Sequence, residues 1–215
     1  MMKLYVMKGA CSLAAHIALV WAKAPHELQI LTHAEVAGKE FIELNPKGAV
    51  PVLIVDDGSV LTESLAILQL IAADFPQARL GAPTDDKFAQ ARLNESLAEM
   101  VSDTHKAWTP IFVPSRFVTK PAYEEDARQA AFRQLDIQYA RLDRIMQGKT
   151  WRLFDRRTVA DAYLYVMCTW KDQTPTPLAS FPSLAAFRAR LDKDPDVMRA
   201  VQSENAAFPA TARIA

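Results

Sequence analysis

A thiol and a hydroxyl stand side by side near the start of the chain, at Cys11 and Ser12. The residues before them predict an apolar strand over 3–7, and the residues after them predict an apolar helix over 13–23. The N-terminus of a helix carries unpaired N–H groups and a partial positive charge, which stabilise a thiolate or another anion. This junction therefore indicates either sulfur chemistry or the binding of an anionic ligand.

Composition excludes several classes of function. The 215 residues carry a formal net charge of zero, so no long-range field favours nucleic acid or an anionic membrane. The longest apolar-rich run, residues 13–22, is too short to span a bilayer, and we expect no secretory signal. The two cysteines, Cys11 and Cys168, are too few for a secreted disulfide scaffold, which favours a cytoplasmic protein with Cys168 in the core.

Other ligand motifs are absent from the sequence. There is no GxGxxG or Walker loop for a nucleotide and no CxxC pair for dithiol redox chemistry. The four histidines lack the spacing of metal ligands, so we expect no metal site.

The elements that must position the first thiol form a small α/β domain. We expect strands over 3–7 and 26–31, a loop over 32–38 and one helical turn over 39–44. Two β-rich runs around Asp57-Gly58 predict a hairpin with a tight primed turn. A helix with Ser64 as its N-cap follows.

After this domain no strand is predicted. Residues 77–85 form a polar linker, and a first helix runs from Asp86 to about Val113, interrupted near two prolines. Further helices are expected over 123–146, 158–171, 183–191 and 195–202. The fold class is therefore an α/β N-terminal domain followed by an all-α C-terminal domain.

This order of elements resembles the cytosolic glutathione S-transferases, and five motifs carry the resemblance. The first is similar to the start of the bacterial beta class. The five are Gly9–Leu13 with His16–Leu19, Asn45–Pro51, Leu61–Ile67, His105-Lys106 and Thr158–Tyr163. The resemblance implies a thioredoxin-like domain over 1–76 that binds glutathione and a helical domain over 86–215 that lines the electrophile site.

The implied activity is the conjugation of the glutathione thiolate to small hydrophobic electrophiles, as in detoxification. Glutathione would be the co-substrate, and the protein would be a homodimer in the cytoplasm. The resemblance also implies that Val50 pairs, in strand fashion, with the cysteinyl part of glutathione after a cis bond to Pro51. Glu63 and Ser64 would hold the ammonium and carboxylate of its γ-glutamyl end, helped by the helix dipole. The alternative for this pair is an ordinary N-cap serine after a solvated glutamate.

Two roles for Cys11 stay open: a hydrogen bond to the glutathione sulfur, or a mixed disulfide with glutathione. A free thiol titrates near pH 8.5, so ionisation at pH 7 requires about 2.7 kcal/mol, from the helix N-terminus and a hydrogen bond such as one from His105. Ser12 is the other candidate for activating the glutathione thiol. Its alternative role is to serve as the N-cap of the first helix. We interpret Tyr5 as a residue of the strand core.

The long helix supplies the remaining candidates. His105 can donate to a thiolate or transfer a proton, unless it is only a surface residue of an amphipathic helix. Lys106 and Ser102 are candidates for contacting glutathione, Ser102 across a dimer interface. Three apolar residues on this helix predict a pocket for the electrophile: Trp108, Ile111 and Phe112. We expect at least one of the three to be a core residue instead.

Thr158 and Asp161 form a capping box, whose role is to fold the second domain. Two other functions are compatible with the same motifs. One is a glutathione-dependent thiol-disulfide transferase or reductase that works through Cys11. The other is a dimeric binding protein without catalysis.

Overall fold

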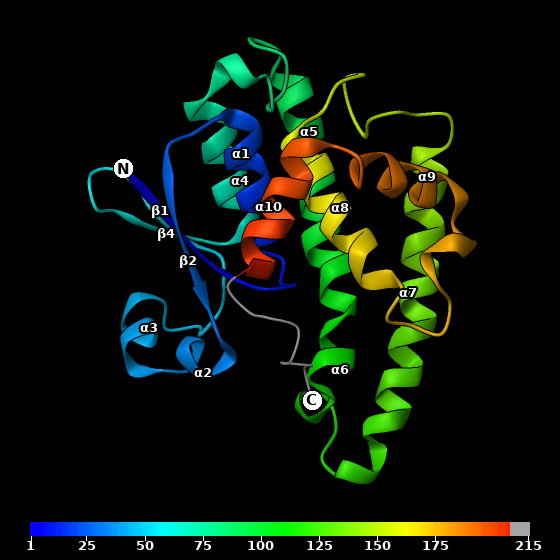
Figure 1. The fold of residues 1–215 in the computed structure, drawn as a ribbon. Coiled ribbons are helices and arrows are strands. Elements are labelled where there is room, and N and C mark those ends of the chain that lie inside the picture. The colour runs from blue at the N-terminus through cyan, green and yellow to red at the C-terminus, as the bar shows by residue number, and fades with distance from the viewer. Residues whose placement is uncertain (207–215) are drawn as a thin grey trace. The chain divides into compact units, whose positions relative to one another are not determined.

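The computed structural model describes residues 1–206. The chain divides into two compact units (Figure 1). The first contains Met1–Gly81 and the segment that begins at Arg190, and the second contains Ala82–Ala189. The fold class is confirmed, because a small mixed sheet with helices precedes a helical region in the chain.

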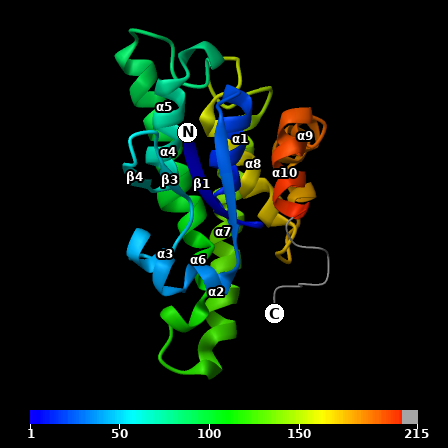
Figure 2. The ribbon, with the colours of Figure 1, turned by 60° about the vertical axis from the view of Figure 1, so that its left-hand side comes forward.

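A four-stranded sheet organises the first unit, in the order β2-β1-β3-β4 (Figure 2). β1 pairs with β2 in parallel and with β3 in antiparallel orientation. The strands and helices of this unit are β1 Met2–Met7, α1 Leu13–Ala22, β2 His26–Leu31, α2 His33–Val36, α3 Lys39–Leu44, β3 Val52–Ile54, β4 Val60–Thr62, α4 Ser64–Asp74 and a 3₁₀ turn at Pro76–Ala78.

Side chains along β1 point alternately to the two faces of the sheet, and the two faces are buried to different degrees. Leu4 and Val6 are fully buried, and all ten residues of α1 are buried. Tyr5 and Met7 point to the opposite face, where they pack against a smaller cluster that includes Phe41 and Val52. Tyr5 is thus a packed strand residue, as predicted.

Two local predictions in this unit are wrong. Residues 32–38 contain α2, because Thr32 and Glu35 form a capping box in which the Thr32 N–H donates to Glu35 Oε2 at 2.7 Å. The hairpin is present, but its connection is three residues long and not a primed turn. The N–H of Gly58 donates to Val55 O at 2.9 Å, and Gly58 alone has a positive φ, 89°. A type I turn followed by a left-handed glycine therefore joins β3 to β4.

The last helix, α10 (Pro195–Ala206), packs against α1, and the two lie side by side in Figure 1. Buried His16 Nδ1 and Glu204 Oε1 are 3.1 Å apart between these helices. We predicted one domain over 86–215, whereas these contacts group the segment from Arg190 with the first unit. The linker over 77–85 stays a prediction.

The second unit is helical throughout its regular elements. The long helix predicted from Asp86 is divided into α5 (Lys87–Glu99), a π-helical segment (Met100–His105) and α6 (Thr109–Phe112). Asp86 caps α5 by accepting the Phe88 and Ala89 N–H groups. The remaining elements are 3₁₀ turns at Pro114–Arg116, Pro121–Tyr123 and Leu178–Ser180, and helices α7 Glu124–Met146, α8 Val159–Lys171 and α9 Pro182–Leu191.

α8 is almost entirely buried and carries Cys168, which is fully buried as predicted. Its capping box is confirmed: the Thr158 N–H donates to Asp161 Oδ2 at 2.8 Å. The Arg152 N–H donates to Asp161 Oδ1 at 2.8 Å, so Asp161 also fastens the preceding loop. Burial raises the pKa of Asp161 to about 6.

Among the described residues, none of the helices is both long and apolar enough to cross a membrane.

Candidate active site

The turn between β1 and α1 is held by Ser12. The Met7 N–H donates to Ser12 Oγ at 3.2 Å, and the Ser12 hydroxyl donates back to Met7 O at 3.4 Å. Ser12 occupies the N-cap position of α1, which was the alternative to a role in activating the thiol. Its side chain, however, makes no capping hydrogen bond to the helix. Because Ser12 is fully buried, these bonds fix the path of the backbone at Cys11.

The Cys11 thiol lies against the loop that enters β3. Cys11 Sγ donates to Val50 O at 3.5 Å. Burial raises the pKa of Cys11 to about 11, although a hydrogen bond with the Ser64 hydroxyl and nearby backbone N–H groups act in the opposite direction. Desolvation of Cys11 thus opposes the stabilisation of its thiolate by the helix N-terminus and favours the thiol form at pH 7.

The loop before β3 contains the predicted cis peptide bond between Val50 and Pro51. The buried Asn45 side chain shapes this loop: its amide donates to Ala49 O at 2.7 Å, and its Oδ1 accepts the Lys47 N–H. Val50 is partly buried and lies two residues before the start of β3.

α4 begins in an unusual way. Glu63 occupies the N-cap position with φ 73° and ψ 122°, a conformation that costs a non-glycine residue about 1–3 kcal/mol. Ser64 is the first residue of the helix and is 7% exposed, so its prediction as the N-cap is wrong. The first N–H groups of an α-helix lack intrahelical acceptors, and this N-terminus therefore suits a carboxylate.

Sequence reasoning missed Lys47 as a member of this group. Lys47 Nζ lies 2.5 Å from Glu63 Oε1, and both side chains are exposed. The sequence marks Lys47 only as part of a turn between Asn45 and Gly48, and no spacing relates it to Glu63. The first unit thus brings Cys11, Val50, Glu63 and Ser64 together, with Lys47 beside the carboxylate.

The other candidates belong to the second unit. His105 ends the π-helical segment, a geometry that is frequent at functional sites. Its Nδ1 lies 2.6 Å from the hydroxyl of the fully buried Tyr163, and its ring meets Trp170 edge-on at 5.1 Å. Tyr163 and Trp170 were also missed, since aromatic residues on an apolar helix indicate only a core.

Two polar candidates and the predicted apolar pocket have different surroundings. Lys106 and Ser102 are exposed, and the Ser102 hydroxyl donates to Asp103 Oδ1 at 2.9 Å. Trp108 is fully buried and stacks on Phe112 at 5.4 Å between ring centroids, so it is a core residue, as expected for at least one of the three.

Ile111 is partly buried and Phe112 is 50% exposed. These two of the three predicted pocket residues can contact a ligand. Among residues 1–206, no three His, Cys, Asp or Glu side chains are grouped so that they could hold a metal ion.

Comparisons with known proteins agree with this arrangement. A family model described as "Glutathione S-transferase, N-terminal domain" matches residues 9–74, and one described as "Glutathione S-transferase, C-terminal domain" matches residues 102–204. A glutathione S-transferase of Xanthomonas campestris is 36% identical over 203 residues, which cover 94% of this chain and 98% of that protein.

Two solved structures are similar over nearly the whole chain. A beta-class glutathione S-transferase of Sphingomonas chungbukensis has a TM-score of 0.85 and 34% identity, with coverage of 94% of this chain and 98% of that chain. A sphingomonad glutathione S-transferase in complex with glutathione has a TM-score of 0.84 and 34% identity, with the same coverage.

Proposed function

Since this chain belongs to the glutathione S-transferase family, we propose that it conjugates the thiolate of glutathione to small hydrophobic electrophiles. The observation that carries this proposal is the group formed by Cys11, the Val50 backbone and the N-terminus of α4. These groups offer a thiol, a peptide edge and a carboxylate site. Glutathione has a thiol, a peptide-like middle and an anionic end that correspond to them.

We assign the γ-glutamyl end of glutathione to the start of α4. Its carboxylate would accept hydrogen bonds from the Ser64 hydroxyl and N–H, and its ammonium would pair with Glu63. Lys47 already pairs with Glu63, so binding would rearrange an exposed ion pair that contributes little to stability. Val50 would pair with the cysteinyl backbone, and the glutathione sulfur would then lie beside Cys11 Sγ.

The raised pKa of Cys11, together with its hydrogen bond to Val50 O, supports a role as a hydrogen-bond donor. A protonated Cys11 donates a hydrogen bond, so it can stabilise a glutathione thiolate without competing with it as a nucleophile. The thiol-disulfide alternative requires an ionised Cys11, and the burial of this thiol does not favour that reaction. Ser12 acts through the backbone at Cys11, since its hydroxyl is bonded to Met7.

In the second unit we assign the electrophile to Ile111 and Phe112, whose side chains are accessible and apolar. His105, held by Tyr163, is the proposed proton donor or acceptor for the sulfur or the leaving group. Lys106 and Ser102 are proposed glutathione contacts, Ser102 across a subunit interface. We further propose that the protein is a homodimer and that it is cytoplasmic, and the two free cysteines support the second of these proposals.

The test measures glutathione binding by isothermal titration and conjugation of a chlorodinitrobenzene by absorbance. We expect saturable binding and turnover, with Cys11→Ala lowering kcat and leaving the affinity for glutathione within a few-fold. Cys168→Ala is the matched control, because Cys168 is the other thiol of the chain and is fully buried in α8. No binding and no turnover by the wild-type protein would contradict the proposal. Conjugation that persists in Cys11→Ala while disulfide reduction is lost would favour the thiol-disulfide function.

A further inference from the structure

A cavity of about 330 Å³ lies in the second unit, between α5, α7 and the loop that precedes α8. Because all of its lining residues belong to Ala82–Ala189, it is a feature of that unit alone. The lining consists of Arg92, Glu95, Ser96, Glu99, Arg141, Ile145, Lys149, Arg152 and Leu153.

Positive charge exceeds negative charge in this cavity. Four lining side chains are cationic and two are carboxylates. Arg92 Nη1 pairs with Glu95 Oε2 at 2.7 Å, one helical turn away. Lys149 is exposed, and within the described part of the chain it pairs with no carboxylate. Lys149 is therefore a cationic group of the cavity that no ion pair neutralises among the described residues.

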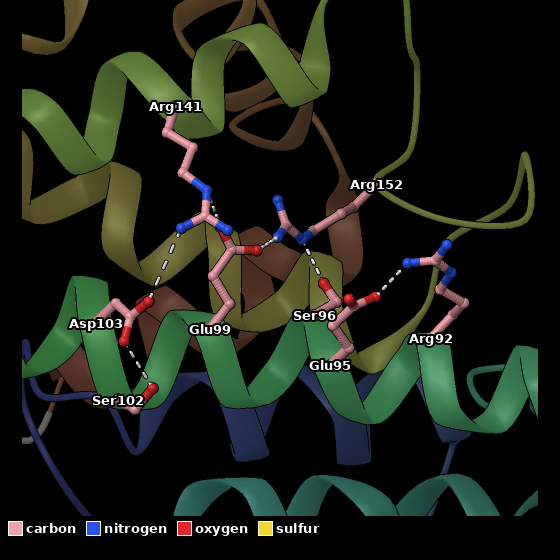
Figure 3. Close-up of polar contacts among 8 residues, drawn as sticks. All are labelled: Arg92, Glu95, Ser96, Glu99, Ser102, Asp103, Arg141 and Arg152. Atoms are coloured by element: carbon pink, nitrogen blue, oxygen red, sulfur yellow. Dashed lines mark hydrogen bonds and ion pairs between the residues drawn. The ribbon is translucent and has the colours of Figure 1, made fainter.

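Arg152 forms the buried side of the cavity and is 3% exposed. Its Nε donates to Ser96 Oγ, and its Nη2 donates to Glu99 Oε2 at 2.6 Å. Figure 3 shows Arg141 and Arg152 converging on Glu99, Arg141 from α7 and Arg152 from the loop, with Arg141 Nε 3.1 Å from Glu99 Oε1. Asp103 Oδ2 lies 4.0 Å from Arg141 Nη1, so Glu99 and Asp103 together face the two guanidinium groups.

The Nη1 group of Arg152 is buried and has no hydrogen-bond partner among the residues that the structure describes. A guanidinium carries five N–H donors, and leaving buried donors unsatisfied is unfavourable. Fastening the loop explains the Nε and Nη2 contacts, and ion pairs with carboxylates explain Arg141, but neither explains Nη1 or the presence of Lys149 at the cavity.

We propose that this cavity binds a small oxyanion group, with Arg152 Nη1, Arg141 and Lys149 as its donors. A tetrahedral or planar oxyanion accepts several hydrogen bonds at once and suits the fork of a guanidinium. It would satisfy the buried donor and balance the excess charge. A neutral apolar ligand would leave Nη1 unsatisfied.

Inorganic phosphate is the probe, titrated calorimetrically into the full chain in a chloride buffer of constant ionic strength. We expect saturable binding that weakens about tenfold in Arg141→Gln and again in Lys149→Gln, since each removes a charge-assisted hydrogen bond. Arg133→Gln is the matched control, because Arg133 is an exposed arginine of α7 that does not line the cavity. Its phosphate affinity should stay within twofold of wild type.

Separate titrations with acetate and glycerol phosphate distinguish a carboxylate from a phosphate ester as the preferred source of the oxyanion. Arg152→Lys keeps the charge and removes the fork, and thermal denaturation verifies that it folds. Crystals soaked in selenate should show an anomalous peak at Arg152 in wild type. The proposal is overturned if phosphate does not bind, if Arg133→Gln weakens binding as much as Arg141→Gln, or if folded Arg152→Lys binds as wild type does.

Discussion

α4 in the first unit and α8 in the second begin under opposite conditions. At α8, Asp161 is fully buried and accepts N–H groups of both Thr158 and Arg152, so the side chains of the chain itself satisfy this end of the helix. At α4, Glu63 stands at the N-cap position with φ 73°, makes no side-chain cap bond and directs its carboxylate to the exposed Lys47. One helix N-terminus is closed by its own sequence, and the other is available to an anion.

This contrast separates stability from function. A closed N-terminus contributes to folding, because each of its hydrogen bonds is present in the native state. An open N-terminus contributes little until a ligand arrives, and its strained residue is retained although it costs stability. Substitutions at α8 should therefore change the free energy of unfolding, and substitutions at α4 should change the affinity for glutathione.

The largest effect is expected for Asp161→Ala. Removing this carboxylate leaves buried donors of Thr158 and Arg152 without acceptors, and we expect a loss of about 4 kcal/mol of unfolding free energy. Tm should fall by roughly 8–16 °C, measured by calorimetry. Asp86→Ala removes an exposed cap of α5 and serves as the control, with a loss of about 1 kcal/mol. Equal losses in the two variants would contradict the closed character of the α8 N-terminus.

The pH dependence of the unfolding free energy tests how Asp161 contributes to stability. Asp161 has a folded pKa raised to about 6 from 3.8. The folded state therefore binds this proton more tightly than the unfolded state, so the Asp161 contribution to stability grows as pH falls through 6 and levels off below 4. Asparagine does not titrate. The difference in unfolding free energy between wild type and Asp161→Asn should increase by roughly 3 kcal/mol from pH 7.5 to pH 4. Denaturant titrations at several pH values measure it, and a constant difference would contradict the raised pKa.

At α4 we expect Ser64→Ala to weaken glutathione binding about tenfold, because a charge-assisted hydrogen bond to the carboxylate is lost. Tm should change little, since Ser64 makes no cap bond with its own helix. Isothermal titration measures the affinity. A large fall in Tm with unchanged affinity would mean that Ser64 has only a structural role.

The same two regions show how far the sequence could predict this molecule. The capping box at Thr158 was predictable because its partners are three residues apart, and hairpins and apolar faces are local in the same way. The contacts that define the site are not local. Cys11 meets the carbonyl of Val50 across 39 positions, and nothing near Cys11 in the sequence indicates that this loop covers its thiol. The direction of the Cys11 pKa shift therefore could not be obtained from the helix N-terminus alone.

Side-chain exposure on the long helix shows a second limit. Trp108 and Phe112 are one turn apart and equally apolar, but Trp108 is fully buried among aromatic rings of α7 and α8 and Phe112 is half exposed. The period of a helix gives its faces, and only the packing of the other helices decides which face is core. The short helix α2 is stabilised by the capping box of Thr32. The polar composition of this segment predicted a loop, so the helix was missed.

The smallest effect is expected for Glu63→Gly, and it separates strain from binding at one residue. Glycine adopts φ 73° without a steric penalty but loses more entropy on folding, so we expect a net gain of about 1 kcal/mol in unfolding free energy. The affinity for glutathione should fall, because the carboxylate that faces the ammonium is removed. Glu63→Gln keeps the side-chain length and the backbone strain, so it should lose affinity without gaining stability. If Glu63→Gly binds glutathione as wild type does, the strained residue has no part in recognition, and the open N-terminus of α4 would act through Ser64 and the backbone alone.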